Sequence, residues 1–243
     1  MRYLNRQLVL AGLVMLLAVA GEARSQTVGG RSLPLTEEER LEARERLAEL
    51  GYWLDPENDP QGVQLRHALI AFQKVEGRAR TGRLTRADLE VIRLAARPLP
   101  RESGERHLEV DLYRQILMVV ETGGEVSRIL PISSGSGECF TEGGRTRRAI
   151  TPVGRFKVER RVEGWRKSPL GLLYYPLYFH YGIAIHGNPA VPPQPASHGC
   201  IRIPIFAAIE LSAQTPVETA VIIYDSNPRP SRPPGPCPPP ANQ

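Results

Sequence analysis

Apolar positions in residues 36–96 recur with the period of an amphipathic helix, in a segment rich in Leu, Ala, Glu and Arg. Thr36 followed by Glu39 is typical of a capping box at a helix N-terminus. The spacing predicts a first helix after this box, a second across residues 64–75 and a third that begins near Thr85. Residues 36–96 are therefore predicted to form a small all-α three-helix bundle.

The pattern changes after a Pro-rich linker at residues 97–106. Beyond the linker, short apolar and alternating runs separated by turn residues predict strands. We expect strands within residues 107–122, 125–133, 154–162, 182–186 and 217–225, and one helix across 206–214. Residues 107–226 are thus predicted to form one mainly β domain. The Pro-rich tail at residues 227–243 cannot bury enough apolar surface to fold and is expected to be disordered.

The first residues have the composition of a secretory signal peptide. Arg2 and Arg6 precede a short apolar run at residues 8–20, and small residues follow it. We predict cleavage near Ala23, which makes residues 1–23 the signal peptide and exports the mature chain to the periplasm or cell wall. The run is shorter than the ~20 apolar residues of a membrane-spanning helix, so a permanent anchor is the less favoured alternative. No stable membrane span is expected after signal cleavage.

The charge of the chain bears on its partners. The formal net charge is +5, from 31 Lys and Arg residues against 26 Asp and Glu residues. The basic residues are scattered along the sequence and form no cluster of the kind that binds nucleic acid. A mildly basic exported protein suits an anionic envelope surface better, so nucleic acid is not an expected partner.

The stretch "IHGNPAVPPQPASHGCIRIP", residues 185–204, holds two of the five histidines and one of the three cysteines. Alternation turns the isoleucines of "GIAIH" and "CIRI" toward the core, which leaves His186, Cys200 and Arg202 on the opposite face. If the two segments are neighbouring strands, these three side chains converge on one open face. The Pro-rich loop at residues 188–197 would then close over the end of that face.

Three explanations of Cys200 differ in the protein they imply. A disulfide has two candidate partners, Cys139 and Cys237, and with three cysteines at least one is free or pairs between chains. Zinc bound by His186, His198 and Cys200 is disfavoured because the spacing is unusual and no fourth ligand is near, so we expect no metal and no other cofactor. A nucleophilic thiolate needs a cationic, partly exposed site with a histidine in reach, and this stretch supplies one.

Two resemblances to known families sharpen these predictions. The segments "LAELGYW", "HALIAFQKVEG" and "TGRLTRADLEVI", in this order, resemble the peptidoglycan-binding-like domain of many bacterial wall enzymes. The segment "ENDPQGVQL" lacks that family's Gly-aromatic-Gly turn and the Thr before its second helix. Two interpretations therefore stay open: a domain that binds the wall, and a helical spacer that holds the next domain off it.

The second resemblance covers nearly all of residues 107–226. "SHGCIR", preceded by "IHG", resembles the active-site signature of the L,D-transpeptidase (YkuD-like) catalytic family, and "SSGSG", "TPVGRFKV" and "GWRKSPLG" are further matches in the right order. It implies a β-sandwich-like catalytic domain. The chain departs from the family in its loop "VPPQPA", which replaces a Gly-containing loop, and at Gly187, where some members have a Ser that orients the histidine. A nearby backbone carbonyl, that of Gly187 or another residue, would have to orient the histidine here.

In that family the cysteine attacks the third residue of a tetrapeptide stem, and the terminal D-alanine leaves. The thioester then passes to the side-chain amine of a neighbouring stem, which gives a 3→3 cross-link, or to water. The resemblance thus implies an L,D-transpeptidase that acts on peptidoglycan stem peptides, with Cys200 as nucleophile and His186 as general base and later acid. Two alternatives stay open: an L,D-carboxypeptidase and a non-catalytic wall-binding protein.

The remaining candidate site residues surround the cysteine. Backbone N–H groups near Gly199 and Cys200 are expected to act as oxyanion donors, and His198 belongs to the same tight catalytic turn. Arg202 and Ser197 are the candidate substrate-binding residues. Arg202 suits the binding of a substrate carboxylate and a structural role equally well.

Overall fold

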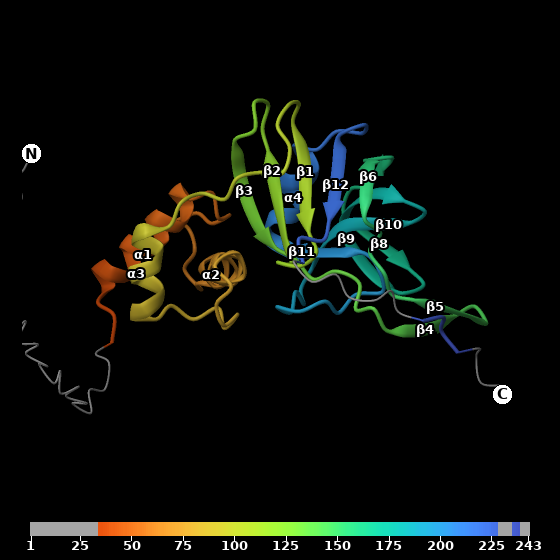
Figure 1. Cartoon of the computed structure of the whole chain (residues 1–243), viewed down its shortest axis with the longest axis horizontal. Coiled ribbons are helices and arrows are strands. Elements are labelled where there is room, and N and C mark those ends of the chain that lie inside the picture. The colour runs from red at the N-terminus through yellow and green to blue at the C-terminus, as the bar shows by residue number, and fades with distance from the viewer. Residues whose placement is uncertain (1–33, 228–234, 239–243) are drawn as a thin grey trace, which may run out of the picture. The chain divides into compact units, whose positions relative to one another are not determined.

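The computed structural model describes residues 34–227 and 235–238 (Figure 1). Nearly all of them belong to one compact unit, Leu35–Gln243. The predicted signal peptide lies outside the described residues, and so do most residues of the tail. Among the residues described, no helix combines the length and the apolar character needed to cross a membrane.

Three helices form the helical region: α1 (Glu37–Glu49), α2 (Val63–Val75) and α3 (Arg86–Leu94). Thr36 and Glu39 form the predicted capping box at the start of α1. Thr85 and Asp88 form a second one at the start of α3. The predicted all-α region of three helices is therefore confirmed, and its helices begin where side-chain oxygens satisfy the first free backbone N–H groups.

Twelve strands and one helix follow: β1 (His107–Asp111), β2 (Ile116–Val120), β3 (Val126–Pro131), β4 (Cys139–Glu142), β5 (Arg145–Arg148), β6 (Gly154–Lys157), β7 (Arg160–Arg161), β8 (Trp165–Ser168), β9 (Gly171–His180), β10 (Ile183–Asn188), β11 (Ile201–Pro204), α4 (Ile205–Ala213) and β12 (Ala220–Tyr224). The first sheet has the strand order β3-β2-β1-β12-β6, and the second has the order β11-β10-β9-β7, with β8 paired to β9. Strands β4 and β5 form a separate hairpin. The mainly β fold predicted for this part of the chain is confirmed.

Strands β1 and β2 of the first sheet are buried on both faces, and β2 shows why. Leu117 and Val119 pack into the core between the two sheets. Ile116, Met118 and Val120 point the other way and pack against the three helices. Since successive side chains of a strand point to opposite faces, a strand that is apolar at every position needs cover on both sides. The helical region supplies one of these covers.

The helical region also covers an edge of the first sheet. The backbone N–H of Trp53 donates to the carbonyl of Ile129 in β3, and the N–H of Ile129 donates to the carbonyl of Gly51. Free strand edges invite unwanted pairing with other chains, and this segment closes one. The "GYW" part of the first resemblance therefore belongs to the junction between the helices and the β domain.

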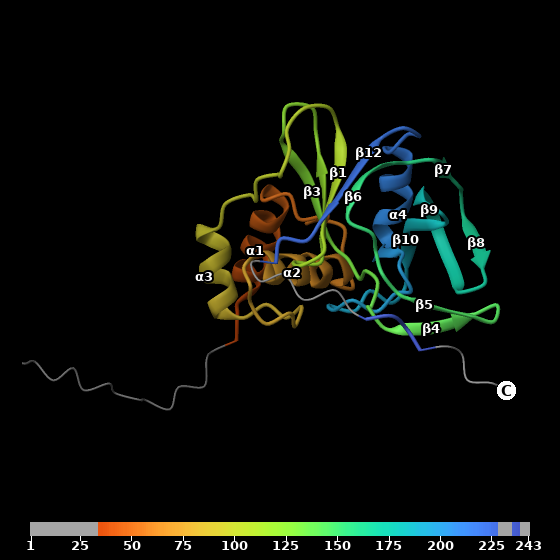
Figure 2. The ribbon, with the colours of Figure 1, turned by 45° about the vertical axis from the view of Figure 1, so that its right-hand side comes forward.

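The second sheet and α4 complete the core. Figure 2 shows α4 beside β9 and β10, and Ala207, Ala208 and Leu211 of this helix lie in the same apolar cluster as the inner faces of both sheets. Ile185 and Ile201 join that cluster from β10 and β11. Their burial confirms the alternation predicted for these two segments.

The β4–β5 and β8–β9 hairpins were not predicted. Strands β4 and β5 are polar and exposed at alternate positions, so they lack the apolar pattern that marks a strand. Gly143 and Gly144 between them are a usual two-residue hairpin turn, and this signal was available in the sequence. Strand β9 contains Pro176 and a run of aromatic residues, which hides its alternation.

A disulfide joins Cys139 at the start of β4 to Cys237 in the tail. Arg148 of β5 also donates to the carbonyl of Gly235. Segment 235–238 is thus tethered to the hairpin, which differs from the mobile tail expected from composition. Composition measures how much apolar surface a segment can bury, and it does not register a covalent link. Cys200 is a free thiol.

Candidate active site

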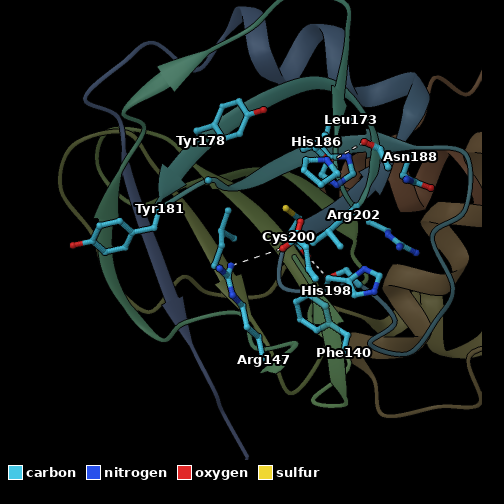
Figure 3. Close-up of a pocket in the computed structure, with 18 of the residues that line it drawn as sticks. Phe140, Arg147, Leu173, Tyr178, Tyr181, His186, Asn188, His198, Cys200 and Arg202 are labelled. Carbon is cyan, nitrogen blue, oxygen red and sulfur yellow. Dashed lines mark hydrogen bonds and ion pairs between the residues drawn. The ribbon is translucent and has the colours of Figure 1, made fainter. Parts of the chain in front are cut away.

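Strands β10 and β11 are parallel neighbours, which brings the candidate residues together. Ile185 pairs with Ile201 and His186 with Arg202. His186, Cys200 and Arg202 all line one pocket (Figure 3). The convergence predicted from strand alternation is therefore present in the structure.

The pocket has a volume of ≈ 480 Å³ and opens over the second sheet. Its walls come from the β4–β5 hairpin, the β8–β9 hairpin, strand β10 with the turn before it, and strand β11 with the turn before it. The lining includes Phe140, Glu142, Arg147, Leu173, Tyr178, Tyr181, His186, Asn188, Ser197, His198, Cys200 and Arg202. Apolar walls with a few converging polar groups are usual for a small-molecule or peptide site.

The imidazole of His186 is oriented by backbone. Its Nδ1 lies 3.0 Å from the carbonyl oxygen of Gly187. Because a carbonyl oxygen only accepts hydrogen bonds, Nδ1 carries the proton and the lone pair is on Nε2. The expectation that a backbone carbonyl takes the place of the orienting serine is confirmed, and the carbonyl is that of Gly187.

Packing explains why residue 187 is a glycine. A Cβ atom there would lie 2.7 Å from Cβ of Ala208 and 3.2 Å from Cδ1 of Tyr174. Any side chain, serine included, would therefore push α4 away from β10.

Burial sets the protonation states of the two reactive groups. Burial, together with the positive charge of Arg202 and against the hydrogen bond to Gly187, lowers the pKa of His186 to about 4. Burial raises the pKa of the Cys200 thiol, although the backbone N–H of Ala184 and the charge of Arg202 oppose this. Near neutral pH the pair is thus a thiol and a neutral imidazole. A thiolate was expected from the sequence, but burial raises the pKa of the thiol more than the charge of Arg202 lowers it.

The turn at residues 197–200 is held by its own side chains and by Thr151. The hydroxyl of Ser197 donates to the carbonyl of Cys200 and accepts from the N–H of Gly199 at 3.0 Å. Thr151 donates to the carbonyl of Gly199 at 2.7 Å. Gly199 has φ +134°, a conformation that only glycine adopts without strain. Ser197 therefore organises the turn, and the Gly199 N–H already has an acceptor. Ser197 also lines the pocket, so the substrate-binding role expected for it stays a prediction.

The "SSGSG" segment holds the turn from the other side. Ser133 exchanges two backbone hydrogen bonds of 3.0 Å with Arg202. The carbonyl of Ser134 accepts from the N–H groups of Ala196 and Ser197, at 3.0 and 2.9 Å. This motif therefore fixes the backbone on both flanks of Cys200 and contributes no reactive side chain.

The second histidine of the stretch lies at the pocket wall. His198 is exposed, and its ring contacts Phe140 of β4 edge to face, with 4.7 Å between ring centroids (Figure 3). His186, in contrast, is 4% exposed. The two histidines thus have different environments, as expected from their different places in the sequence.

Comparison with known proteins agrees with this geometry. Residues 105–223 match the family model of the L,D-transpeptidase catalytic domain (YkuD), and residues 36–92 match that of a peptidoglycan binding domain. A crystal structure of the L,D-transpeptidase from Xylanimonas cellulosilytica shares 39% sequence identity with this chain at a TM-score of 0.72, over 80% of this chain and 95% of that one. The chain belongs to the L,D-transpeptidase family.

More distant L,D-transpeptidases share less of the structure. The one from Stackebrandtia nassauensis is 22% identical, with a TM-score of 0.46 over 79% of this chain and 93% of that one. The one from Mycobacterium smegmatis is 20% identical, with a TM-score of 0.39 over 49% of this chain and 58% of that one. No curated protein sequence matches the chain. The protein is an enzyme of the L,D-transpeptidase class, with a peptidoglycan-binding type of region before its catalytic domain.

The structure of this L,D-transpeptidase adds pocket residues that the sequence analysis did not single out. Phe140, Glu142 and Arg147 reach the pocket from the β4–β5 hairpin, and Tyr181 reaches it from the turn after β9. These residues could not be predicted from the sequence, because they are distant from Cys200 along the chain and only folding brings them to the site. Tyr178 also lines the pocket, whereas the ring of Trp165 contacts that of Tyr174 at a tilt, with 4.7 Å between centroids.

Proposed function

We propose that the protein forms 3→3 cross-links between peptidoglycan stem peptides through an acyl-enzyme on Cys200. The observation that carries the proposal is the orientation of His186. Its Nδ1 proton is held by Gly187, and its basic Nε2 belongs to a ring that lines the same pocket as the free thiol of Cys200. A nucleophile, an oriented base and a peptide-sized pocket are what acyl transfer requires.

Acylation starts from the neutral pair. Sγ of Cys200 attacks the carbonyl carbon at the third residue of a donor tetrapeptide while the thiol proton moves to Nε2 of His186. The carbonyl oxygen becomes an oxyanion, and we assign its stabilisation to the N–H of Cys200, since the N–H of Gly199 donates to Ser197. The C–N bond then breaks as His186 returns the proton to the departing amine of D-alanine. The products are free D-alanine and a thioester.

Deacylation repeats these steps with a new nucleophile. The side-chain amine of an acceptor stem attacks the thioester carbon, and His186 takes the proton that the amine loses. The C–S bond breaks, the sulfur leaves, and His186 returns a proton to it. An amide bond between two stems has formed. If water takes the place of the amine, the product is a tripeptide, as in a carboxypeptidase.

Arg202 is the candidate for binding a substrate carboxylate. Its guanidinium forms no ion pair among the described residues and lines the pocket beside His186. A carboxylate bound there would lie near the reactive pair.

Since the family acts on peptidoglycan, we further propose that the mature enzyme is exported and works in the periplasm or cell wall. Fractionation of the producing cells would test this.

Product analysis tests the proposed reaction. The purified full-length protein is incubated with tetrapeptide stems, and the products are weighed by mass spectrometry. We expect release of D-alanine together with a cross-linked dimer, and neither from Cys200→Ala with an unchanged circular dichroism spectrum. Tripeptide without dimer would replace the transpeptidase with a carboxypeptidase, and turnover by Cys200→Ala would remove the nucleophile from the proposal.

A pH series separates the two histidines. Because the pKa of His186 is about 4, the neutral base persists in acid, and acylation should be lost only as the pH falls through about 4. His186→Ala should abolish acylation at neutral pH and recover part of it in alkali, where the thiol ionises without help. His198→Ala should lower the rate without alkaline recovery. Alkaline recovery in the His198 variant alone would reverse the assignment.

A further inference from the structure

Lys74 of the helical region is buried in the β domain without a counter-ion. Only 2% of it is exposed, and its Nζ donates to the carbonyls of Gln115 at 3.0 Å and Ile132 at 2.8 Å. None of the ion pairs in the described part of the chain includes this amine. An apolar side chain would fill the same space at lower cost, since a buried amine must be desolvated. The lysine therefore calls for an explanation other than packing.

The first acceptor leads to the loop before the catalytic turn. Gln115 is buried between β1 and β2. Its side chain forms two hydrogen bonds with Ser134. Nε2 of Gln115 donates to Oγ of Ser134 at 2.7 Å, and Oε1 of Gln115 accepts from the backbone N–H of Ser134 at 3.0 Å. The carbonyl of Ser134 in turn accepts from the N–H groups of Ala196 and Ser197. Lys74 thus holds the backbone of Gln115, and the side chain of Gln115 in turn holds Ser134.

From Ser197 the path reaches the nucleophile. Its hydroxyl donates to the carbonyl of Cys200 and accepts from the N–H of Gly199. A continuous series of hydrogen bonds and short backbone steps therefore runs from the amine of Lys74 to the backbone of Cys200.

The second acceptor leads to the opposite flank of the cysteine. Ile132 directly precedes Ser133, which exchanges two backbone hydrogen bonds with Arg202. The hydroxyl of Ser133 also donates to the carbonyl of Gln194, at 2.8 Å. The two hydrogen bonds of Lys74 therefore lead to residues on both sides of Cys200 in the sequence.

A second basic residue of the helical region touches the same loop. Nη1 of Arg80 donates to the carbonyl of Pro193, at 3.2 Å. The Pro-rich loop between His186 and Cys200 is thus held by the helical region directly as well as through Lys74.

We propose that Lys74 is a positioning residue for acyl transfer, which holds the turn of Cys200 in its reactive geometry from within the helical region. The proposal rests on the proposed function, because acyl transfer needs both the sulfur and the oxyanion donor of the turn to be in place. Simple alkylation of the thiol needs only the sulfur. A displaced turn should therefore slow acylation far more than alkylation.

The test compares these two reactions in the full-length chain. Acylation of Cys200 by a carbapenem and alkylation by iodoacetamide are followed by mass spectrometry in the wild type, in Lys74→Met and in the control Arg86→Met. Arg86 pairs with Glu39 inside the helical region, so this control weakens that region away from the turn. In Lys74→Met we expect the acylation of Cys200 to be about tenfold slower than in the wild type, because small misplacements of reacting groups slow a reaction by such factors. The rate of alkylation should stay within about twofold of the wild type. Arg86→Met should match the wild type in both.

A second variant keeps the proposal testable if Lys74→Met does not fold. Ser134→Ala removes only the hydroxyl that accepts from Gln115, so it should fold and show the same selective loss. If Lys74→Met folds and its Cys200 is acylated at the wild-type rate, the proposal is overturned. If Lys74→Met is unfolded, acylation of Ser134→Ala at the wild-type rate overturns it. Equal losses of acylation and alkylation that follow the unfolded fraction would overturn it too. Failure of the proposed function is a separate result: the wild type itself would not be acylated.

Discussion

The helical region and the β4–β5 hairpin are held against the rest of the fold by different means. The helical region covers one face of the first sheet with a shared apolar core. The hairpin is polar, adds Phe140 and Arg147 to the pocket wall, and is tied to the tail by the disulfide between Cys139 and Cys237. A segment with an apolar face is held by burial, and a segment without one needs a covalent link or specific hydrogen bonds.

This difference also decides between a spacer and an integral part. A spacer would share little surface with the domain it holds. Here Ile116, Met118 and Val120 of β2 are fully covered by the helices, and Gly51 and Trp53 pair with the edge strand β3. The spacer interpretation is therefore not supported within the described chain, whereas binding of the wall by these helices stays a prediction.

Deleting residues 24–96 should have the largest effect. If the helices were only a spacer, such a truncation would leave acyl transfer on small stems nearly unchanged. The structure predicts instead that it exposes the outer face of the first sheet, at roughly 1.5–3 kcal/mol for each large apolar side chain. The loss is comparable to the ~5–15 kcal/mol stability of a whole domain. Circular dichroism and soluble yield measure it, and a folded, fully active truncation would restore the spacer interpretation.

A matched pair of substitutions compares the two regions directly. Met118→Ala opens a cavity in the core shared with the helices and should cost ~2–5 kcal/mol of unfolding free energy. Thr141→Ala removes an exposed hydroxyl from β4 and should cost less than about 0.5 kcal/mol. Denaturant unfolding of both variants gives the two numbers. Similar costs would show that burial does not distinguish the two regions.

Stability should depend on pH through Lys74. Burial, aided by repulsion from Arg80, lowers the pKa of Lys74 to about 7. The unfolded chain keeps this proton up to about pH 10.4, so unfolding takes up a proton between these values and the folded state gains stability as pH rises. Relative to Lys74→Met, the unfolding free energy of the wild type should therefore increase from pH 7 to 10. A constant difference across this range would contradict the lowered pKa.

Breaking the disulfide should affect global stability less than the truncation or Met118→Ala. A native disulfide typically contributes ~2–4 kcal/mol by restricting the unfolded chain. In Cys237→Ser paired with Cys139→Ser, segment 235–238 is released in the folded state too, so we expect a loss below about 2 kcal/mol. The affinity for donor stems should weaken more clearly, because the hairpin lines the pocket. A large drop in melting temperature with unchanged KM would contradict this order.

Several features could be predicted from local sequence because their causes are local. The capping box at Thr36 and the helix start at Thr85 depend on side chains three residues apart. The shared face of His186 and Cys200 followed from strand alternation and is present. The role of Gly187 was also within reach, since a carbonyl next to the histidine was the available substitute for the missing serine.

Other features needed the folded chain, because they depend on residues far apart in sequence. Cys139 and Cys237 are 98 residues apart, and nothing local marks them as partners. The sequence by itself determined the helical and β regions, the order of their motifs and the residues facing one pocket, since hydrophobic period and motif spacing are properties of neighbours. Only the tertiary structure decided that burial keeps the Cys200 thiol protonated and that Lys74 supports the catalytic turn. Desolvation and long-range hydrogen bonds arise when distant segments pack together, and local patterns do not contain them.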